Sequence, residues 1–125
     1  MHDKSIADRM YLKTARSLAI FNGEVHPGLV AQMPPDLLEA GREQAEVVLM
    51  LAINQSDLEK FFAQALERLG ETGSLWIAFL KPTASKATDL TRDSVTDWVE
   101  QRGVAVVANM SIDGDWTSLR VKRID

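Results

Sequence analysis

The sequence predicts a small α/β domain with a doubly wound, mostly parallel sheet and a C-terminal antiparallel hairpin. Continuous apolar runs, typical of strands buried on both faces, alternate along the chain with amphipathic helical patterns. Helices that join buried strands favour right-handed parallel crossovers between them. The last run instead alternates apolar and polar residues after a tight-turn signal at Asp113-Gly114, which indicates a hairpin. A length of 125 residues fits a single domain that spans residues 1–125.

The first part of the chain predicts short elements. An amphipathic pattern over residues 6–12 predicts a short helix. Residues 17–22 form an apolar run that ends at an Asn-Gly pair, as in a buried strand closed by a turn. Pro27 suits the first position of a helix, so we expect a helix over residues 28–32. Residues 36–44 fit either a helix or an edge strand, and both alternatives stay open.

The middle of the chain contains the clearest strand and helix. Residues 45–53 are almost continuously apolar, as in a strand of a parallel sheet. Ser56 and Glu59 have the spacing of a capping box and predict the start of a helix there. This helix carries one apolar stripe and is expected to end at Gly70. The stripe consists of Leu58, Phe61, Phe62, Ala65, Leu66 and Leu69.

The last part of the chain adds three strands and a helix. Residues 75–80 form another continuous apolar strand. Thr91 is the expected N-cap of a helix over residues 92–102. Residues 104–112 predict a strand, and residues 116–124 predict a half-buried strand that completes the hairpin.

Composition excludes several chemistries. The chain has no cysteine, which removes disulfides, thiolate catalysis and cysteine metal sites, and its two histidines make a metal site unexpected. A net charge of −4 gives no basic footprint for nucleic acid. No stretch approaches the roughly 20 apolar residues of a membrane span. The N-terminus lacks the apolar core of a secretory signal, so we expect a cytoplasmic protein.

The loop that follows residue 80 is the strongest candidate for a binding site. A lysine directly after a strand, hydroxyl groups in the loop and a helix N-terminus beyond it can together hold an anion. The alternative is a solvated loop in which Thr91 or Asp89 only caps the next helix. The candidate residues are Lys81, Ser85, Lys86, Thr88 and Thr91.

Polar residues also follow the first two apolar strands. Asn22-Gly23 and Asn54 are expected to face each other at the carboxyl ends of neighbouring strands, where open α/β sheets bind ligands. Their side-chain amides suit a neutral polar group, and the alternative is ordinary turn and helix-start chemistry. His26 is interpreted as a surface loop residue, because no motif supplies it with an orienting partner and a nucleophile. No catalytic residue is predicted.

The order of elements resembles the class I S-adenosylmethionine-dependent methyltransferase fold, a parallel Rossmann-like sheet that ends in an antiparallel hairpin. Three stretches also resemble a family of small uncharacterised bacterial proteins, the domain of unknown function three thousand and fifty-two. That family has no established activity, so the resemblance implies a fold and no function. The three stretches are SLAIFNG over residues 17–23; Leu75-Trp76-Ile77-Ala78 with Lys81, Ala84, Ser85, Thr88, Asp89 and Leu90; and Asp113, Trp116, Ser118 and Leu119.

The cofactor features that the methyltransferase resemblance implies are missing. The first loop of that fold carries several closely spaced glycines, whereas residues 21–28 hold two glycines with Pro27 between them. The acid that holds the ribose should end a second strand, and only Asp36 and Glu39 lie in the ambiguous segment. We therefore expect neither S-adenosylmethionine nor another cofactor to bind.

Two functions stay open. The favoured one is a non-catalytic binding or interaction module on a degenerate methyltransferase-like scaffold, with a protein partner at an exposed apolar patch for which Trp116 is a candidate. The alternative is a small-molecule enzyme, or a nucleotide or anion binder, that uses the carboxyl edge of the sheet. The sequence leaves enzymatic activity undecided between these alternatives.

Overall fold

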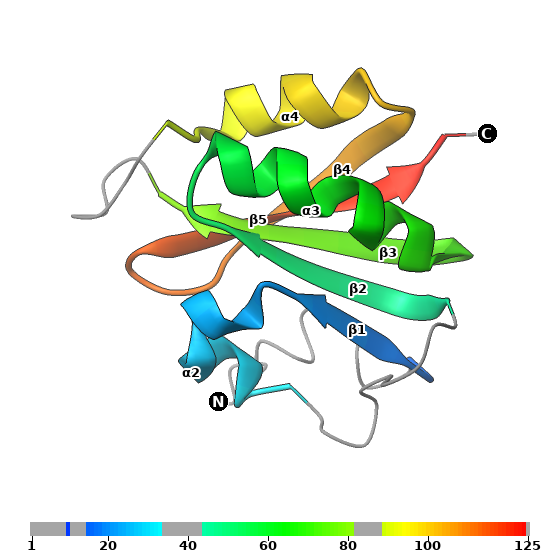
Figure 1. Ribbon diagram of the computed structural model, residues 1–125, viewed down its shortest axis with the longest axis horizontal. Coiled ribbons are helices and arrows are strands. Elements are labelled where there is room, and N and C mark those ends of the chain that lie inside the picture. The colour runs from blue at the N-terminus through cyan, green and yellow to red at the C-terminus, as the bar shows by residue number, and fades with distance from the viewer. Residues whose placement is uncertain (1–9, 11–14, 34–43, 82–88, 125) are drawn as a thin grey trace, which may run out of the picture.

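The computed structural model describes Met10 and residues 15–33, 44–81 and 89–124 (Figure 1). Its helices and strands follow one another in an α/β order. They are β1 (Leu18–Phe21), the 3-10 turn η1 (Gly23–Val25), α2 (Pro27–Val30), β2 (Ala45–Ala52), α3 (Gln55–Arg68), β3 (Leu69–Leu80), α4 (Arg92–Glu100), β4 (Val104–Ser111) and β5 (Trp116–Arg123).

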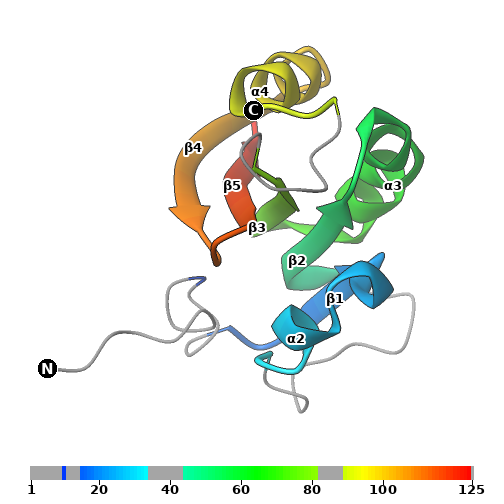
Figure 2. The ribbon, with the colours of Figure 1, turned by 90° about the vertical axis from the view of Figure 1, so that its left-hand side faces the viewer.

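One five-stranded mixed sheet, in the order β1-β2-β3-β5-β4, forms the centre of the domain. β1, β2 and β3 pair in parallel, and β5 pairs antiparallel with both β3 and β4. β4 therefore runs in the same direction as the first three strands. Figure 2 shows α3 and α4 on one face of this sheet and α2 on the other. The predicted α/β class, with its parallel sheet and terminal hairpin, is confirmed.

The core consists of two apolar clusters, one on each face of the sheet. Val48 and Met50 of β2 pack on the side of α3 and α4, together with Phe62. Leu49 and Leu51 of the same strand point to the opposite side. Alternate residues of a strand face opposite sides of a sheet, so an uninterrupted apolar run is required when both sides are covered. No described helix is long and apolar enough to cross a membrane.

The start of α3 differs from the capping box predicted at Ser56 and Glu59. The helix begins two residues earlier, and its N-cap is Asn54, whose side chain accepts a hydrogen bond from the Asp57 amide at 2.8 Å. The Asp57 carboxylate in turn accepts the Ile53 amide at 3.1 Å. Asparagine is as good an N-cap as serine, and a carboxylate can satisfy a backbone amide at this end of a helix.

The helix α3 ends just before Gly70, as predicted, with Leu69 as its C-cap. β3 begins directly there, much earlier than the predicted residue 75, so Gly70 is also part of the strand. The pairing of β2 with β3 is irregular at this point, because Ala45 pairs with Leu69 whereas Val47 pairs with Ser74. Gly73 permits this irregular approach, since a Cβ atom there would lie 2.5 Å from the Glu46 carbonyl oxygen. Close backbone approach of this kind is a typical use of glycine in a strand.

The last strand is more buried than predicted. Trp116 is 8% exposed and Ser118 only 1%, so Trp116 does not contribute to an exposed apolar patch. The reason is packing on the face that carries α2, where Trp116 belongs to the apolar cluster with Leu29 and Met33. Of the helix predicted over residues 6–12, only Met10 is described, and it is buried as expected. The ambiguous segment 36–44 lies outside the described residues except for Gln44.

Candidate functional site

The carboxyl ends of β1, β2 and β3 lie along one edge of the sheet, because these strands are parallel neighbours. Asn22, Asn54 and Lys81 follow these three strands within two residues and therefore lie along this carboxyl edge. Ligands in open α/β sheets bind beyond such an edge. The hydrogen bonds of each side chain decide what the edge can offer to a ligand.

Asp57 links Asn22 to Asn54. The Asn22 side chain donates from Nδ2 to the Leu51 carbonyl oxygen at 2.9 Å and to Asp57 Oδ2 at 3.4 Å. The Asp57 amide donates to Asn54 Oδ1, which closes the chain of contacts. Asn22 has a left-handed backbone with φ of 62°, a conformation that asparagine tolerates better than most residues. The structure thus brings the two asparagines together, but they bond to the protein itself.

Gly23 serves close packing next to Asn22. A Cβ atom at this position would lie 2.9 Å from Val30 Cγ2 and 3.0 Å from Ile20 Cγ2. The glycine therefore allows η1 and α2 to approach β1 closely. This role is different from that of a glycine that lets a phosphate approach the backbone.

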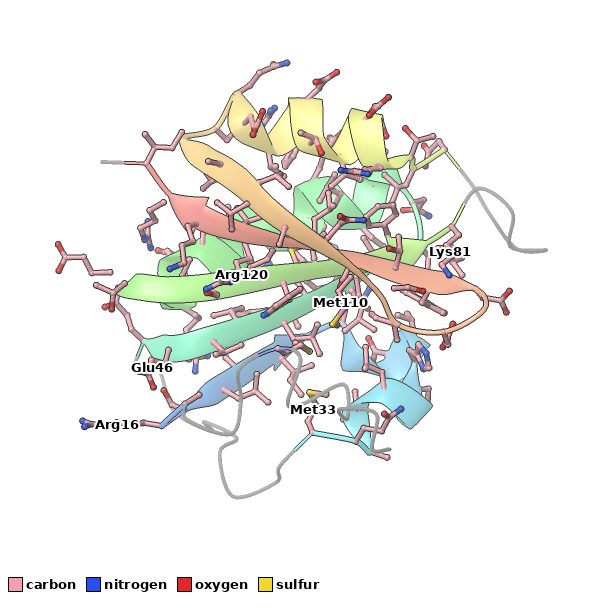
Figure 3. All side chains as sticks on the ribbon, turned by 180° about the vertical axis from the view of Figure 1, so that it is seen from behind. Arg16, Met33, Glu46, Lys81, Met110 and Arg120 are labelled. Carbon is pink, nitrogen blue, oxygen red and sulfur yellow. The ribbon has the colours of Figure 1, made fainter. Side chains whose placement is uncertain are left out.

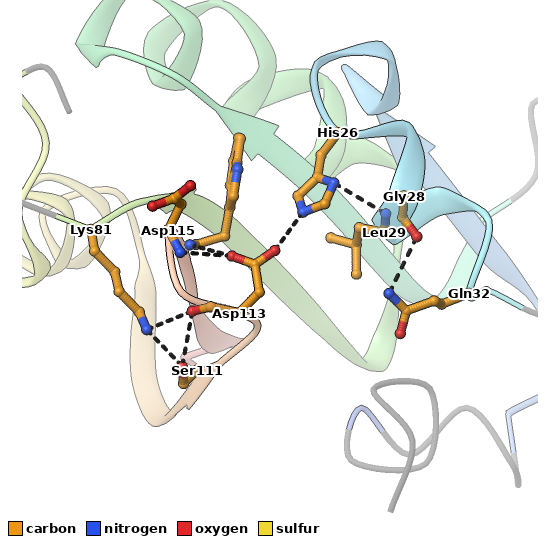
Figure 4. A network of polar contacts seen from close by, with 9 residues as sticks. His26, Gly28, Leu29, Gln32, Lys81, Ser111, Asp113 and Asp115 are labelled. Carbon is orange, nitrogen blue, oxygen red and sulfur yellow. Dashed lines mark hydrogen bonds and ion pairs between the residues drawn. The ribbon is translucent and has the colours of Figure 1, made fainter. Parts of the chain in front are cut away.

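Lys81 is directed away from the asparagines and toward the β4–β5 hairpin. Its ammonium donates to Ser111 Oγ at 2.8 Å and to the Asp113 carbonyl oxygen at 2.7 Å (Figure 4). Its backbone amide also donates to the Asp115 carbonyl oxygen at 2.7 Å. Lys81 therefore fastens the end of β3 to the hairpin.

Thr91 is the N-cap of α4, as predicted, and forms a reciprocal capping box with Ser94. Just before it, Asp89 Oδ1 accepts a hydrogen bond from the Gln55 amide at 2.9 Å, at the first residue of α3. A carboxylate from the chain itself thus occupies this helix N-terminus. The remaining predicted loop residues, Ser85, Lys86 and Thr88, lie outside the described residues.

His26 is not an ordinary surface loop residue. It is the N-cap of α2, where Nδ1 accepts the Leu29 amide at 3.2 Å, and Nε2 lies 2.9 Å from Asp113 Oδ2. Because Nδ1 accepts a hydrogen bond, the geometry assigns the proton to Nε2, which donates to Asp113. The ring also lies 5.2 Å from that of Trp116. Both nitrogens are therefore engaged, and neither is left to act as a base (Figure 4).

Asp113 is the hub of this network. Burial raises the pKa of its carboxyl group, but hydrogen bonds from His26 and from the Asp115 and Trp116 amides outweigh it and hold the pKa below its usual value. The two amides donate to Oδ1 at 2.8 Å each. The cap itself had a signal in the sequence, since His26 directly precedes Pro27 at the helix start. No sequence pattern links His26 to a partner 87 residues away.

β1 is an edge strand in the described part of the chain, where it pairs only with β2. In Rossmann-type sheets of strand order 3-2-1-4-5-6, the strand with the ribose-binding acid lies beside the first strand. No described strand takes that position here. Asp36 and Glu39, the acids considered from the sequence, lie outside the described residues.

An open apolar hollow lies between β1 and α2, with a volume of about 470 Å³. This volume is within the range of small-molecule sites, although the hollow is shallow. Among the described residues, no group of three or more His, Cys, Asp or Glu side chains could hold a metal ion. The hollow is lined by Ile20, Gly23, Glu24, Pro27, Val30 and Ala31.

The architecture is that of a methyltransferase-like fold, and solved methyltransferases share it. An O-methyltransferase family protein from Burkholderia thailandensis matches with a TM-score of 0.64 and 15% identity, over 90% of this chain and 52% of that one. The CcbJ methyltransferase from Streptomyces caelestis matches with a TM-score of 0.63 and 10% identity, over 94% of each chain. The mitomycin 7-O-methyltransferase MmcR matches with a TM-score of 0.61 and 11% identity, over 87% of this chain and 49% of that one.

These similarities define the fold alone, because the identities are far too low to carry a function across. The chain also spans only about half the length of MmcR and of the Burkholderia protein. No family model matches the sequence, and no curated protein is similar to it. The methyltransferase-like fold predicted from the sequence is thus confirmed, and the resemblance to the small bacterial family is not.

Proposed function

We propose that this chain is a non-catalytic binding or interaction module on a methyltransferase-like scaffold. The observation that carries the proposal is the closed network at the end of β1. Asn22 donates to the Leu51 carbonyl oxygen and to Asp57, where a cofactor loop would present free backbone amides. His26, which caps α2 nearby, has both ring nitrogens engaged. The membership in the small bacterial family and the cytoplasmic location stay predictions.

The non-catalytic part of the proposal is tested by titrating the protein with S-adenosylmethionine in a calorimeter. We expect no saturable heat, because the glycine-rich loop is absent and β1 has no described neighbour to carry the ribose-binding acid. A cooperative thermal unfolding transition in the same sample establishes that the protein is folded. Micromolar affinity, together with a higher unfolding temperature in the presence of S-adenosylmethionine, would overturn the proposal.

The binding part is tested at the apolar hollow beside α2. We expect apolar fragments that raise the unfolding temperature of the wild type to lose this effect in Ala31→Arg, because the new side chain fills the hollow. Gln32→Arg is the matched control, since Gln32 is an exposed neighbour that does not line the hollow. Equal losses in both variants, or no stabilising fragment at all, would count against a binding role for this surface.

The alternative function is a small-molecule enzyme, or a nucleotide or anion binder, at the carboxyl edge. It is supported by Asp89, whose carboxylate accepts a hydrogen bond from the Gln55 amide at the start of α3. This helix N-terminus therefore already holds a negatively charged group. The site would comprise Asn22, Gly23, Asn54, Lys81, Ser85, Lys86, Thr88 and Thr91. Crystals soaked in phosphate, alongside a Lys81→Ala, Lys86→Ala variant, test it. Ordered phosphate at this edge and loss of phosphate stabilisation in the variant would favour this function over the first.

A further inference from the structure

A polar hollow lies at the opposite, amino edge of the sheet, on the face that carries α2. It has a volume of about 140 Å³ and lies where β2 and β3 begin and β5 ends. Figure 3 shows Glu46 and Arg120 on this side of the sheet, far from Lys81. We name it the amino-edge hollow; it is lined by Ala15, Glu46, Val47, Thr72, Ser74, Arg120 and Lys122.

Ser74 and Arg120 form the floor of the amino-edge hollow. Arg120 Nε donates to Ser74 Oγ at 3.0 Å, which holds the guanidinium beside Ser74. Ser74 is only 8% exposed, although it is polar. Its hydroxyl oxygen is used as an acceptor, but its own O–H has no acceptor among the described residues. A buried hydroxyl group with an unused donor marks a place where a ligand acceptor would be stabilised.

Lys122 and Thr72 add further donors around Ser74. Lys122 lies two residues after Arg120 on β5, so both cations are on the same face of the sheet. Neither the Lys122 ammonium nor the Thr72 hydroxyl contacts an acceptor among the described residues. The one carboxylate in the lining is Glu46, which accepts the Arg16 backbone amide at 2.5 Å. Cations and hydroxyl donors therefore outnumber the acidic groups in the hollow.

We propose that the amino-edge hollow binds a small oxyanion, such as phosphate or the phosphate group of a phosphomonoester. The Lys122 ammonium supplies a point charge and the Ser74 hydroxyl donates from the floor, while Arg120 adds positive charge beside them. The volume equals that of roughly five water molecules, which accommodates one tetrahedral anion but no nucleoside. This site is separate from the carboxyl edge and from any function proposed there.

The test is an amide NMR titration with inorganic phosphate at constant ionic strength. We expect a dissociation constant of about 1 mM or lower, and shifts that centre on Thr72, Ser74 and Lys122. Lys122→Gln should weaken binding about tenfold, because it removes a charge-assisted hydrogen bond. Lys60→Gln is the matched control, since it removes the same charge from exposed α3 on the other face. It should change the affinity by less than about twofold.

Two further arms sharpen the test. Glu46→Gln should strengthen phosphate binding, because it removes a negative charge from the lining that repels the anion. Ribose 5-phosphate and acetate, titrated beside phosphate, distinguish a phosphomonoester from a free oxyanion and from a carboxylate. The proposal is overturned if phosphate causes no saturable shifts, if the shifts centre on Asn22 and Asn54 instead, or if the two lysine variants lose affinity equally.

Discussion

The two edges of the sheet differ in how their polar side chains are used. At the carboxyl edge, Asn22, Asn54 and Lys81 all bond to other parts of the chain. At the amino edge, Lys122 has no partner among the described residues, and the Ser74 hydroxyl has no acceptor. Open α/β sheets bind ligands at the carboxyl edge. In the described part of this chain, however, the carboxyl edge has fewer unused hydrogen-bonding groups than the amino edge.

Helix capping explains why the polar side chains at the carboxyl edge are already hydrogen-bonded within the protein. The first amides of each helix have no partner within the helix and need one nearby. Asn54, Thr91 and His26 each accept such an amide, in α3, α4 and α2 respectively. Residues that cap helices are of the same types as residues that bind ligands, so their presence after a strand does not separate the two roles. At the amino edge, Arg123 of β5 donates to the Leu66 and Leu69 carbonyl oxygens at the end of α3, whereas Lys122 and Ser74 cap no helix.

The largest expected effect tests the core on which both edges depend. Phe62→Ala should lower the free energy of unfolding by about 3–5 kcal/mol, because Phe62 is almost fully buried and packs edge-to-face on Trp98. Leu66→Ala should cost less, about 2 kcal/mol, since Leu66 is only partly buried. Urea denaturation measures both. A loss below about 1 kcal/mol for Phe62→Ala would mean that this helix face does not support the sheet.

Much of the fold was predictable because apolar periodicity reports burial directly. The run at residues 45–53 and the stripe through Leu58, Phe62 and Ala65 reappear as β2 and the buried face of α3. The capping box at Ser56 was wrong because Asn54 competes for the same role two residues earlier. The burial of Trp116 could not be predicted, since it depends on packing against distant residues such as Leu29 and Met33.

The site was predictable only in part, for a related reason. Strand ends located Asn22, Asn54 and Lys81 at one edge, because neighbouring parallel strands end together. Which partner each side chain bonds depends on contacts between distant segments, such as that of His26 with Asp113. The amino-edge hollow likewise joins residues of β2, β3 and β5, and Ser74 gave no signal in an apolar strand.

A smaller effect should separate the two edges directly. Asn22→Ala should cost about 1–3 kcal/mol, because alanine is strained at a φ of 62° and the bonds to Leu51 and Asp57 are lost. Asn22→Gly should cost roughly 1 kcal/mol less than this, since glycine adopts that φ without strain. Lys122→Gln should change stability by no more than about 0.5 kcal/mol. Urea denaturation of all three variants makes the comparison.

Similar losses in Asn22→Ala and Lys122→Gln would contradict the contrast between a self-bonded carboxyl edge and an available amino edge. Equal losses in the alanine and glycine variants of Asn22 would instead place the whole effect in the hydrogen bonds. The left-handed backbone would then contribute nothing measurable to the requirement for asparagine at this position.

The smallest expected effect is a pH dependence at the hub of the carboxyl edge. The hydrogen bonds from His26 and the hairpin amides hold the pKa of Asp113 below its usual value despite burial. Asp113 therefore stabilises the fold above its unfolded pKa of about 3.9, and this stabilisation disappears as the pH falls through the lower folded value. The effect should be modest, since the Asp113 side chain is 43% exposed and solvent screens the interaction.

Asp113→Asn isolates this contribution, because asparagine cannot accept from His26 and from the hairpin amides with both oxygens. We expect the stability difference between wild type and variant to be largest at pH about 5 and to shrink by pH about 2.5, as the wild-type carboxylate becomes protonated. Asp115→Asn is the control, since the neighbouring Asp115 contributes its backbone to these contacts. Its difference from wild type should stay constant over the same range. A constant difference for Asp113→Asn as well would show that the hub acts through its shape and packing rather than through its charge.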